Sequence, residues 1–553
     1  MTGYCFEQFG RRVVVDTAGQ VLLAELDDQA SGSERTRDPS PEDPFRRNQD
    51  DSWRAPVHAS VSSAGLRCDF TPMFALMAKR KAFDDRLLAR LEHVLHHGVA
   101  DREGSVGLVD RIRRQLPSGT EMRGLLDAAL HLVRGSWPEQ SADEESARRW
   151  VACFEVDPIQ SQPIGVYTRS SALQRIFRHD RLLQWRLGSS EASAIAEVLR
   201  GEPTLLAAYR SHLVLISRIN GPFATPPVLE PEELTAIFPA SDSMMARLLE
   251  DRFGNRPIPH DFALGAELVA RIRDGRLPTE PGEDDGWYAY KLHADAALLS
   301  PCTEGLRVGP RYAEELEQTF QSLITCDRQT HVKQLERLVL GGIPFSVAPR
   351  VTVEPLPDHY ARVAEGYRFL REQLSEHLGV SVVRGIQIDD YGRVGPSIHD
   401  ALLEIELLMR GAQVVSRAEL GHPLPSTTLH DAAQSVFRSW QRRSADDPDL
   451  ALDLAAITPI FYDIERRTTR ICATLGVETR SLRFEFVERP AVSVFGEATH
   501  GSNEPSYPPA RHLVMCPITI ECDVKTLPSR EQLRKLCDEH EHPAAIKAAL
   551  EAR

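Results

Sequence analysis

Apolar residues recur at spacings of three and four over most of this chain, and this periodicity restricts its fold more than any other feature. The first such stripe ends at Gly98 and consists of Phe83, Leu87, Leu88, Leu91, Val94 and Leu95. This spacing places the side chains on one face of an α-helix, and glycine commonly follows the last turn of a helix. The pattern predicts a mainly α-helical fold.

Similar stripes continue along the chain and are separated by glycine or proline. We expect a first series of helices at 108–116, 122–133, 173–187, 194–199, 205–219, 244–249 and 264–272, and a second at 312–340, 359–378, 399–412, 428–443 and 450–475. A polar segment with proline and glycine, 276–286, separates the two series. The sequence therefore predicts a multi-helix array in one or two lobes, spanning residues 61–280 and 287–480.

The C-terminal part has a different period. After Val477 apolar and polar residues alternate over 481–488, 491–496 and 512–524, as they do in half-buried strands. Ser529 is followed three residues later by Gln532, a capping-box pair that predicts a helix running through Leu550. Residues 481–553 are therefore expected to form a small antiparallel β-sheet followed by a terminal helix.

The N-terminal part is expected to lie outside the helical array. Residues 1–26 alternate β-branched and charged stretches around a turn at 16–19, which predicts a β-hairpin. Residues 27–60 are rich in Asp, Ser, Pro and Arg and contain little that could be buried, so we expect a disordered linker there.

Composition excludes several classes of function. The 553 residues contain 65 Lys and Arg against 80 Asp and Glu, giving a formal net charge of -15. Because phosphate contact needs clustered cations, we expect no nucleic acid and no membrane as a partner, and a protein partner or a small molecule stays open. No run of 18 apolar residues is present, and the N-terminus lacks the uninterrupted apolar region of a secretory signal.

The cysteines agree with a cytoplasmic location. Nine are scattered along the chain and none has the C-x-x-C spacing, which is typical of reduced thiols. Cys516 and Cys522 could pair across adjacent strands, but buried free thiols are the favoured interpretation. A bias toward Arg and Ala hints at a bacterial source.

Three stretches resemble a bacterial family of large, mostly helical proteins, the domain-of-unknown-function 3160 family. They are Phe154–Phe177, with its Asp157, Pro163, Gly165, Tyr167 and Thr168; Tyr312–Gln334, with its Asp327, Lys333 and Gln334; and Val353–Arg362, which reads VEPLPDHYAR. Ile164 and Val166 stand where the family has Arg and His, and Cys326 stands where it has His. The resemblance implies a helical fold and no particular reaction.

Two pairs of residues are candidates for chemistry. Asp327 and His331 are four positions apart on an expected helix and share one face, as metal ligands would, although an ordinary ion pair is the simpler alternative. Glu497 and His500 lie in a Gly-flanked loop after a strand, where an acid and a base could act together.

A third candidate is the histidine cluster at the end of the first helix. Glu92 is followed by His93, His96 and His97, and histidines at a helix C-terminus interact favourably with the helix dipole. A zinc site would need further ligands, and no HExxH motif is present.

Two functions are compatible with these features. The first is a soluble helical protein with a binding or scaffold role in a bacterial pathway, which suits a chain that lacks the family's polar residues at 164, 166 and 326. The second is a metal-assisted or acid-base enzyme, a hydrolase or a tailoring enzyme, that uses Asp327, His331, Glu497 and His500. The cofactor is unknown and could be a divalent transition metal if the enzyme is metal-assisted. The sequence leaves open whether the protein is an enzyme.

Overall fold

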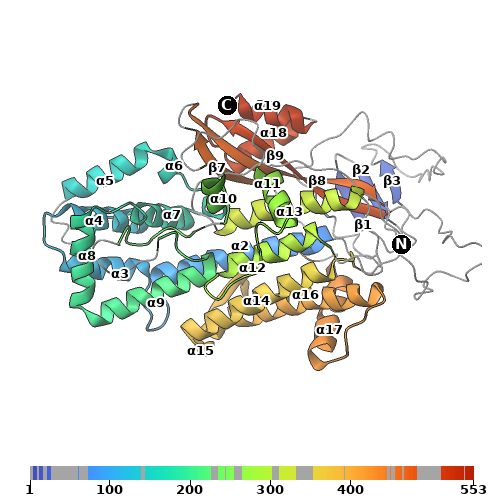
Figure 1. Ribbon diagram of the computed structural model, residues 1–553, viewed down its shortest axis with the longest axis horizontal. Helices are drawn as coiled ribbons and strands as arrows, with labels where there is room; N and C mark the ends of the chain where they lie inside the picture. Colours follow the sequence, from blue (N-terminus) through green and yellow to red (C-terminus); the bar gives the residue numbers. More distant parts are fainter. Residues whose placement is uncertain are drawn as a thin grey trace, which may run out of the picture.

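The computed structural model describes most of the helical body. The described residues are 4–8, 11–15, 21–25, 60–61, 73–138, 144–225, 234–242, 244–253, 264–301, 310–331, 353–390, 393–444, 447, 449, 455–463, 466–482, 512–540 and 542–552. Helices dominate, and long ones lie side by side along the long axis of the molecule (Figure 1). The mainly α-helical fold with a small antiparallel sheet near the C-terminus is confirmed.

Most helices follow the expected stripes, but those at 144–156, 158–161, 287–296 and 380–385 were not expected. Residues 332–340 of the helix expected at 312–340 lie outside the described residues. In the first half of the chain they are α2 (Met73–His97), α3 (Ser105–Gln115), α4 (Glu121–Arg134), α5 (Glu144–Val156), α6 (Pro158–Ser161), α7 (Ser171–Leu183), α8 (Ser189–Gly201), α9 (Pro203–Asn220), α10 (Met244–Phe253) and α11 (Leu264–Arg273). In the second half they are α12 (Trp287–Ala296), α13 (Pro310–His331), α14 (Pro357–Leu378), α15 (Val380–Gly385), α16 (Ile398–Glu419) and α17 (Thr428–Arg443). None of the described helices is long and apolar enough to cross a membrane.

The sheet begins earlier than expected. Its strands are β7 (Ala456–Asp463), β8 (Thr468–Leu482) and β9 (His512–Val524), in the order β7-β8-β9 and all antiparallel. The helix expected at 450–475 was therefore wrong over its larger part. The segment is rich in β-branched residues and contains Pro459, which is tolerated on the edge strand β7 but not inside a helix.

The last helix is interrupted. Ser529 accepts a hydrogen bond from the backbone N–H of Gln532, whose side chain accepts one from the N–H of Ser529, so the expected capping box is confirmed. It opens α18 (Arg530–Glu539), and Pro543 then starts a separate helix, α19 (Pro543–Glu551), because proline fits the first turn of a helix and not its interior. Both helices cover the sheet from the side away from α13 (Figure 1).

The N-terminal strands form more than a hairpin. The expected pair corresponds to β2 (Arg11–Val15) and β3 (Val21–Glu25), which are antiparallel. Two further strands, β1 (Tyr4–Gln8) and β4 (Ser60–Val61), extend them into a sheet of order β3-β2-β1-β4. Apart from Ser60, the linker expected at 27–60 lies outside the described residues.

Cys516 and Cys522 lie on the same strand, β9, six residues apart. Six residues of a strand span about 20 Å, whereas a disulfide needs Cα atoms within about 7 Å. The two residues therefore do not bridge adjacent strands, and Cys522 is a buried free thiol.

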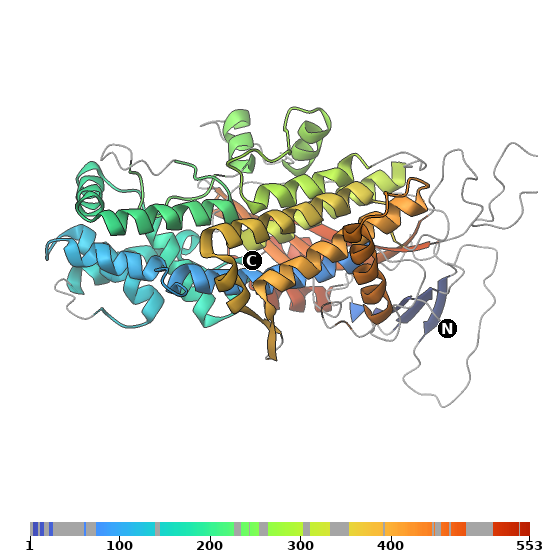
Figure 2. The ribbon, with the colours of Figure 1, turned by 90° about the horizontal axis from the view of Figure 1, so that it is seen from below.

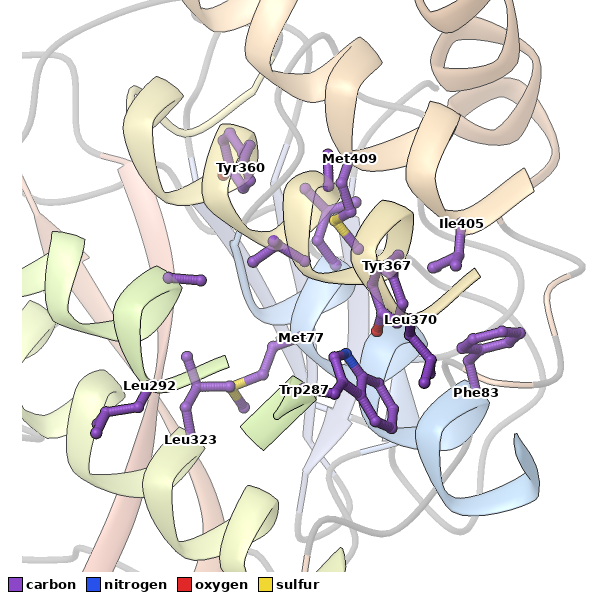
Figure 3. Close-up of a cluster of buried hydrophobic side chains, with 14 of the residues drawn as sticks. Met77, Phe83, Trp287, Leu292, Leu323, Tyr360, Tyr367, Leu370, Ile405 and Met409 are labelled. Atoms are coloured by element: carbon purple, nitrogen blue, oxygen red, sulfur yellow. The ribbon is translucent and has the colours of Figure 1, made fainter. Parts of the chain in front are cut away.

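Two large apolar cores lie in the helical body, and α2 contributes to both. One contains residues of α12, α13, α14 and α16, and Figure 3 shows part of it, with Met77 and Phe83 of α2 near Trp287, Tyr367 and Leu370. The other contains residues of α3, α4, α7, α8 and α9 together with Leu88 of α2. The view in Figure 2 shows α2 running through the body between these groups of helices. A third, smaller core joins the sheet to α18 and α19.

Candidate metal centre

The last turn of α2 places His96 inside the protein. His96 is buried, whereas His93 and His97 on either side of it are exposed and lie against each other with ring centroids 4.6 Å apart. Burial follows from the apolar stripe, since Leu95 and Leu91 face the core and His96 lies beside them on the helix. Of the histidines in the Glu92–His97 cluster, His96 alone is enclosed by other helices.

The helix α7 brings two further polar groups to His96. Nε2 of His96 is 2.6 Å from Oδ1 of Asp180, and Nδ1 of His179 is 3.0 Å from the same oxygen. The rings of His96 and His179 meet edge to face with centroids 5.6 Å apart. Ser170 fixes the start of α7 by accepting a hydrogen bond from the backbone N–H of Leu173, and Leu173, Ile176 and Phe177 then bury the helix face that carries His179 into the core.

The other ring nitrogen of His96 has a defined role. Nδ1 is 2.7 Å from the backbone carbonyl oxygen of Glu92, which can only accept, so Nδ1 carries a proton and donates it. A backbone or carboxylate acceptor behind a histidine is the usual way in which proteins orient a metal-binding imidazole and fix its tautomer. Nε2 is consequently the atom of His96 that faces the remaining polar groups.

The Glu92 side chain adds a second buried carboxylate beside the site. Its Oε1 accepts a hydrogen bond of 2.8 Å from the hydroxyl of Tyr167, and its Oε2 is 3.5 Å from Nδ1 of His96. Tyr167 is itself buried and belongs to the short 3-10 helix Gly165–Thr168. Two carboxylates, Glu92 and Asp180, therefore lie beside His96, and a divalent cation would balance their charge.

His96, His179 and Asp180 fit a divalent metal in their chemistry. Each offers one ligand atom, and these atoms all lie within 4.8 Å of one another. Imidazole nitrogen and carboxylate oxygen are common zinc ligands with bonds of about 2.0–2.2 Å, which puts two ligands of a tetrahedral site about 3.3 Å apart. The hydrogen-bonded distance of 2.6 Å is shorter, so a metal would replace the shared proton and Asp180 would withdraw slightly.

A third histidine, His212, lies in the electrostatic environment of these residues. Burial, together with the smaller effects of His96 and Arg102 and against the effect of Asp180, lowers the pKa of His212 on α9 to about 3. Burial also lowers the pKa of His97, with a further contribution from His93. His212 is therefore neutral at physiological pH and does not add positive charge to the centre.

The residues predicted from the sequence lie elsewhere or outside the described residues. Asp327 on α13 is buried and bound by two cations, with Arg80 Nη2 at 2.5 Å and Lys291 Nζ at 2.8 Å. The backbone of His331 ends α13, but its side chain is outside the described residues, and so are Glu497 and His500. That Asp327, His331, Glu497 and His500 share one site therefore stays a prediction.

The sequence pointed to Glu92 and His96 as candidates, but not to His179 and Asp180. The cluster containing Glu92 and His96 is visible as a run of polar residues, but nothing near it in the sequence supplies further ligands. His179 and Asp180 are 83 and 84 positions later, and their only signal is an adjacent His-Asp pair within an apolar helical stripe. Only the packing of α7 against α2 brings them to His96.

Comparison with known protein families finds no family model that matches the chain. No curated protein and no solved structure matches it either. The arrangement of His96, His179 and Asp180 is therefore interpreted from its own geometry and chemistry.

Proposed function

We propose that this protein binds a divalent transition metal with His96, His179 and Asp180 as its ligands. The observation that carries the proposal is the convergence of two imidazole nitrogens on one carboxylate oxygen, at 2.6 and 3.0 Å, in a mostly buried position. A set of two histidines and one carboxylate suits zinc and iron in particular. Metal binding is a specific form of the binding role that the sequence favours.

A second candidate function follows from the number of ligands. Three protein ligands leave one tetrahedral position open, as in catalytic zinc sites, and the Asp180 side chain is 14% exposed, so the centre borders on solvent. We propose metal-assisted hydrolysis as this candidate, in which the metal would polarise a water molecule at the open position. The enzyme built on Asp327, His331, Glu497 and His500 and the resemblance to the 3160 family remain predictions.

The proposal is tested by metal binding to chelator-treated protein. Wild type, His179→Ala and His93→Ala would be titrated with Zn²⁺ and with Co²⁺, whose visible absorption reports the coordination number. His93 is a matched control because it lies on α2 three positions before His96 and is exposed. We expect one tightly bound ion in wild type and in His93→Ala and at least a hundredfold weaker binding in His179→Ala.

Two results would overturn the proposal. One is wild-type protein that binds neither ion. The other is equal affinity in wild type and His179→Ala, which would place any bound metal elsewhere. In either case His96, Asp180 and His179 would form a hydrogen-bonded trio that only joins α2 to α7.

A further inference from the structure

A separate set of charged side chains is buried where α2, α12 and α13 meet. It consists of three carboxylates, Asp84, Asp295 and Asp327, and two cations, Arg80 and Lys291, all of them buried. We call these five residues the core charge cluster. Buried charges are costly unless each is paired, so the excess of one carboxylate over the cations needs an explanation.

The contacts within the core charge cluster are unequal. Arg80 donates to Oδ1 of Asp295 at 2.7 Å and to Oδ2 of Asp327 at 2.5 Å, and its Nε lies 3.8 Å from Oδ2 of Asp84, so one guanidinium is shared by three carboxylates. Lys291 Nζ is 2.8 Å from Oδ2 of Asp84 and 2.8 Å from Oδ1 of Asp327. Asp327 therefore contacts both cations, whereas among the described residues Asp295 contacts Arg80 and not Lys291.

Asp295 has the least compensated carboxyl group in the cluster. It is completely buried, and within the described part of the chain its Oδ2 atom has no hydrogen-bond partner. An ionised carboxylate in this position would leave one oxygen without a donor in an apolar environment, which is more costly than leaving a neutral carboxyl group there.

The other titratable groups packed around Asp295 do not supply the missing charge. On α14, Nδ1 of His359 donates to the backbone carbonyl oxygen of Ala294 at 2.8 Å, and burial lowers the pKa of His359 to about 3, so it is neutral. Tyr367, also on α14, donates to Oδ1 of Asp84 at 2.7 Å. Lys81 on α2 is paired with Asp85, at 2.6 Å.

We propose that Asp295 binds a proton in the folded protein at neutral pH and below, and that release of this proton to solvent weakens the attachment of α12 to α2. The core charge cluster is then a pH-sensitive element in the helical body. Release leaves two full negative charges, on Asp295 and Asp327, that share the guanidinium of Arg80. Burial, with the charge of Asp327 adding to it, accordingly raises the pKa of Asp295 to about 7, against the opposing effect of Arg80.

The direction of the pH effect follows from proton counting. An unfolded aspartate ionises near pH 3.9, so between about pH 4 and pH 7 the folded state binds more protons than the unfolded state at this residue. The contribution of Asp295 to stability is therefore complete below pH 4 and is lost as the pH rises through 7. Within that window the equilibrium constant for unfolding increases by up to about tenfold per pH unit from this residue.

The test compares unfolding of the chelator-treated full chain with that of Asp295→Asn from pH 5 to pH 8.5. Asparagine has the shape of a protonated aspartate and cannot ionise. We expect wild type to lose stability relative to Asp295→Asn as the pH rises, with a change of at least tenfold in the ratio of their unfolding constants. Asp284→Asn, an exposed residue just before α12, is the control and should parallel wild type.

A second measurement uses wild type alone and does not depend on the folding of a variant. Infrared spectroscopy detects the carbonyl stretch of a protonated carboxyl group. The band of Asp295 should be lost as the pH rises through about 7, whereas burial raises the pKa of Glu521 to about 9, so the band of Glu521 should persist to higher pH. Parallel pH profiles of wild type and Asp295→Asn, or a wild-type spectrum that loses no carboxyl band between pH 6 and pH 8, would overturn the proposal. Neither experiment involves the metal centre, so its outcome is independent of metal binding.

Discussion

Nε2 of His96 lies 2.6 Å from Oδ1 of Asp180, although the two residues are 84 positions apart in the chain. This contact joins the last turn of α2 to α7, and Nδ1 of His179 lies 3.0 Å from the same oxygen. The centre therefore contains the imidazole of His96, which the Glu92 carbonyl orients, a second imidazole from His179 and the carboxylate of Asp180.

The charge of Glu92 should matter for metal affinity. Glu92→Gln keeps the shape of the side chain and an oxygen that can accept from Tyr167, but removes one of the two carboxylates beside His96. We expect metal affinity to fall by about 10- to 100-fold, as for other residues behind metal ligands. Calorimetric titration would measure it, with the exposed Glu197→Gln of α8 as a control that should bind as wild type does.

Arg80 should be among the least replaceable residues of the helical body. Arg80→Met leaves Asp295 without the cation that it contacts and deprives Asp327 of one of two, and breaking such buried pairs costs about 3–5 kcal/mol. Arg86→Met lies on the same helix, but the Arg86 side chain is partly exposed and its partner Asp449 keeps a second cation, Lys79, so a clearly smaller loss is expected. Denaturant unfolding measures both, and equal losses would contradict the assigned role of Arg80.

The apolar stripes at helical spacing predicted most of the helices, because this spacing decides which face of a helix is buried. They failed at 450–475, where β-branched residues near Pro459 favour an edge strand and helical spacing is coincidental. The metal centre could be foreseen only in part, because His96 and Asp180 meet through tertiary packing that no local pattern encodes. The core charge cluster has the same origin, since Arg80, Asp295 and Asp327 come from three helices.

Gly411 should be required for the packing of α17 on α16. A Cβ atom at this position would lie 2.5 Å from Cβ of Phe437 and even closer to the carbonyl oxygen of Ala433, both on α17. We expect Gly411→Ala to destabilise the protein by about 1–3 kcal/mol, the usual range for overpacking. A Cβ atom at Gly201, at the end of α8, would meet nothing within 4 Å, so Gly201→Ala should be neutral or stabilising. Thermal unfolding measures both variants, and equal losses would contradict the assigned role of Gly411.

The buried neutral imidazole of His359 should make the folded protein less stable as the pH is lowered. Its pKa is lowered by burial to about 3, whereas an unfolded histidine titrates near 6.5, so the unfolded state binds more protons between these values. The contribution of His359 to the free energy of unfolding is fully present above pH 6.5. It decreases by about 1.4 kcal/mol for each pH unit below that value. His359→Asn can still donate to the carbonyl of Ala294 and should lose less stability than wild type between pH 6.5 and 5.

The slopes expected from His359 and Asp295 have opposite signs over part of this range. The pH profile of wild type alone is therefore uninformative, and each effect has to be read from the difference between wild type and the matching variant. A His359→Asn profile that runs parallel to that of wild type would show that the imidazole is not buried as a neutral group.

The central claim is that His96, His179 and Asp180 coordinate one metal ion. X-ray absorption spectroscopy of stoichiometrically zinc-loaded wild type measures this most directly, because it reports the identity of the ligands and their distances from the metal. The account predicts two imidazole nitrogens and at least one carboxylate oxygen at about 2.0–2.2 Å. A shell of oxygen ligands without imidazole, or protein that retains no zinc after desalting, would contradict it.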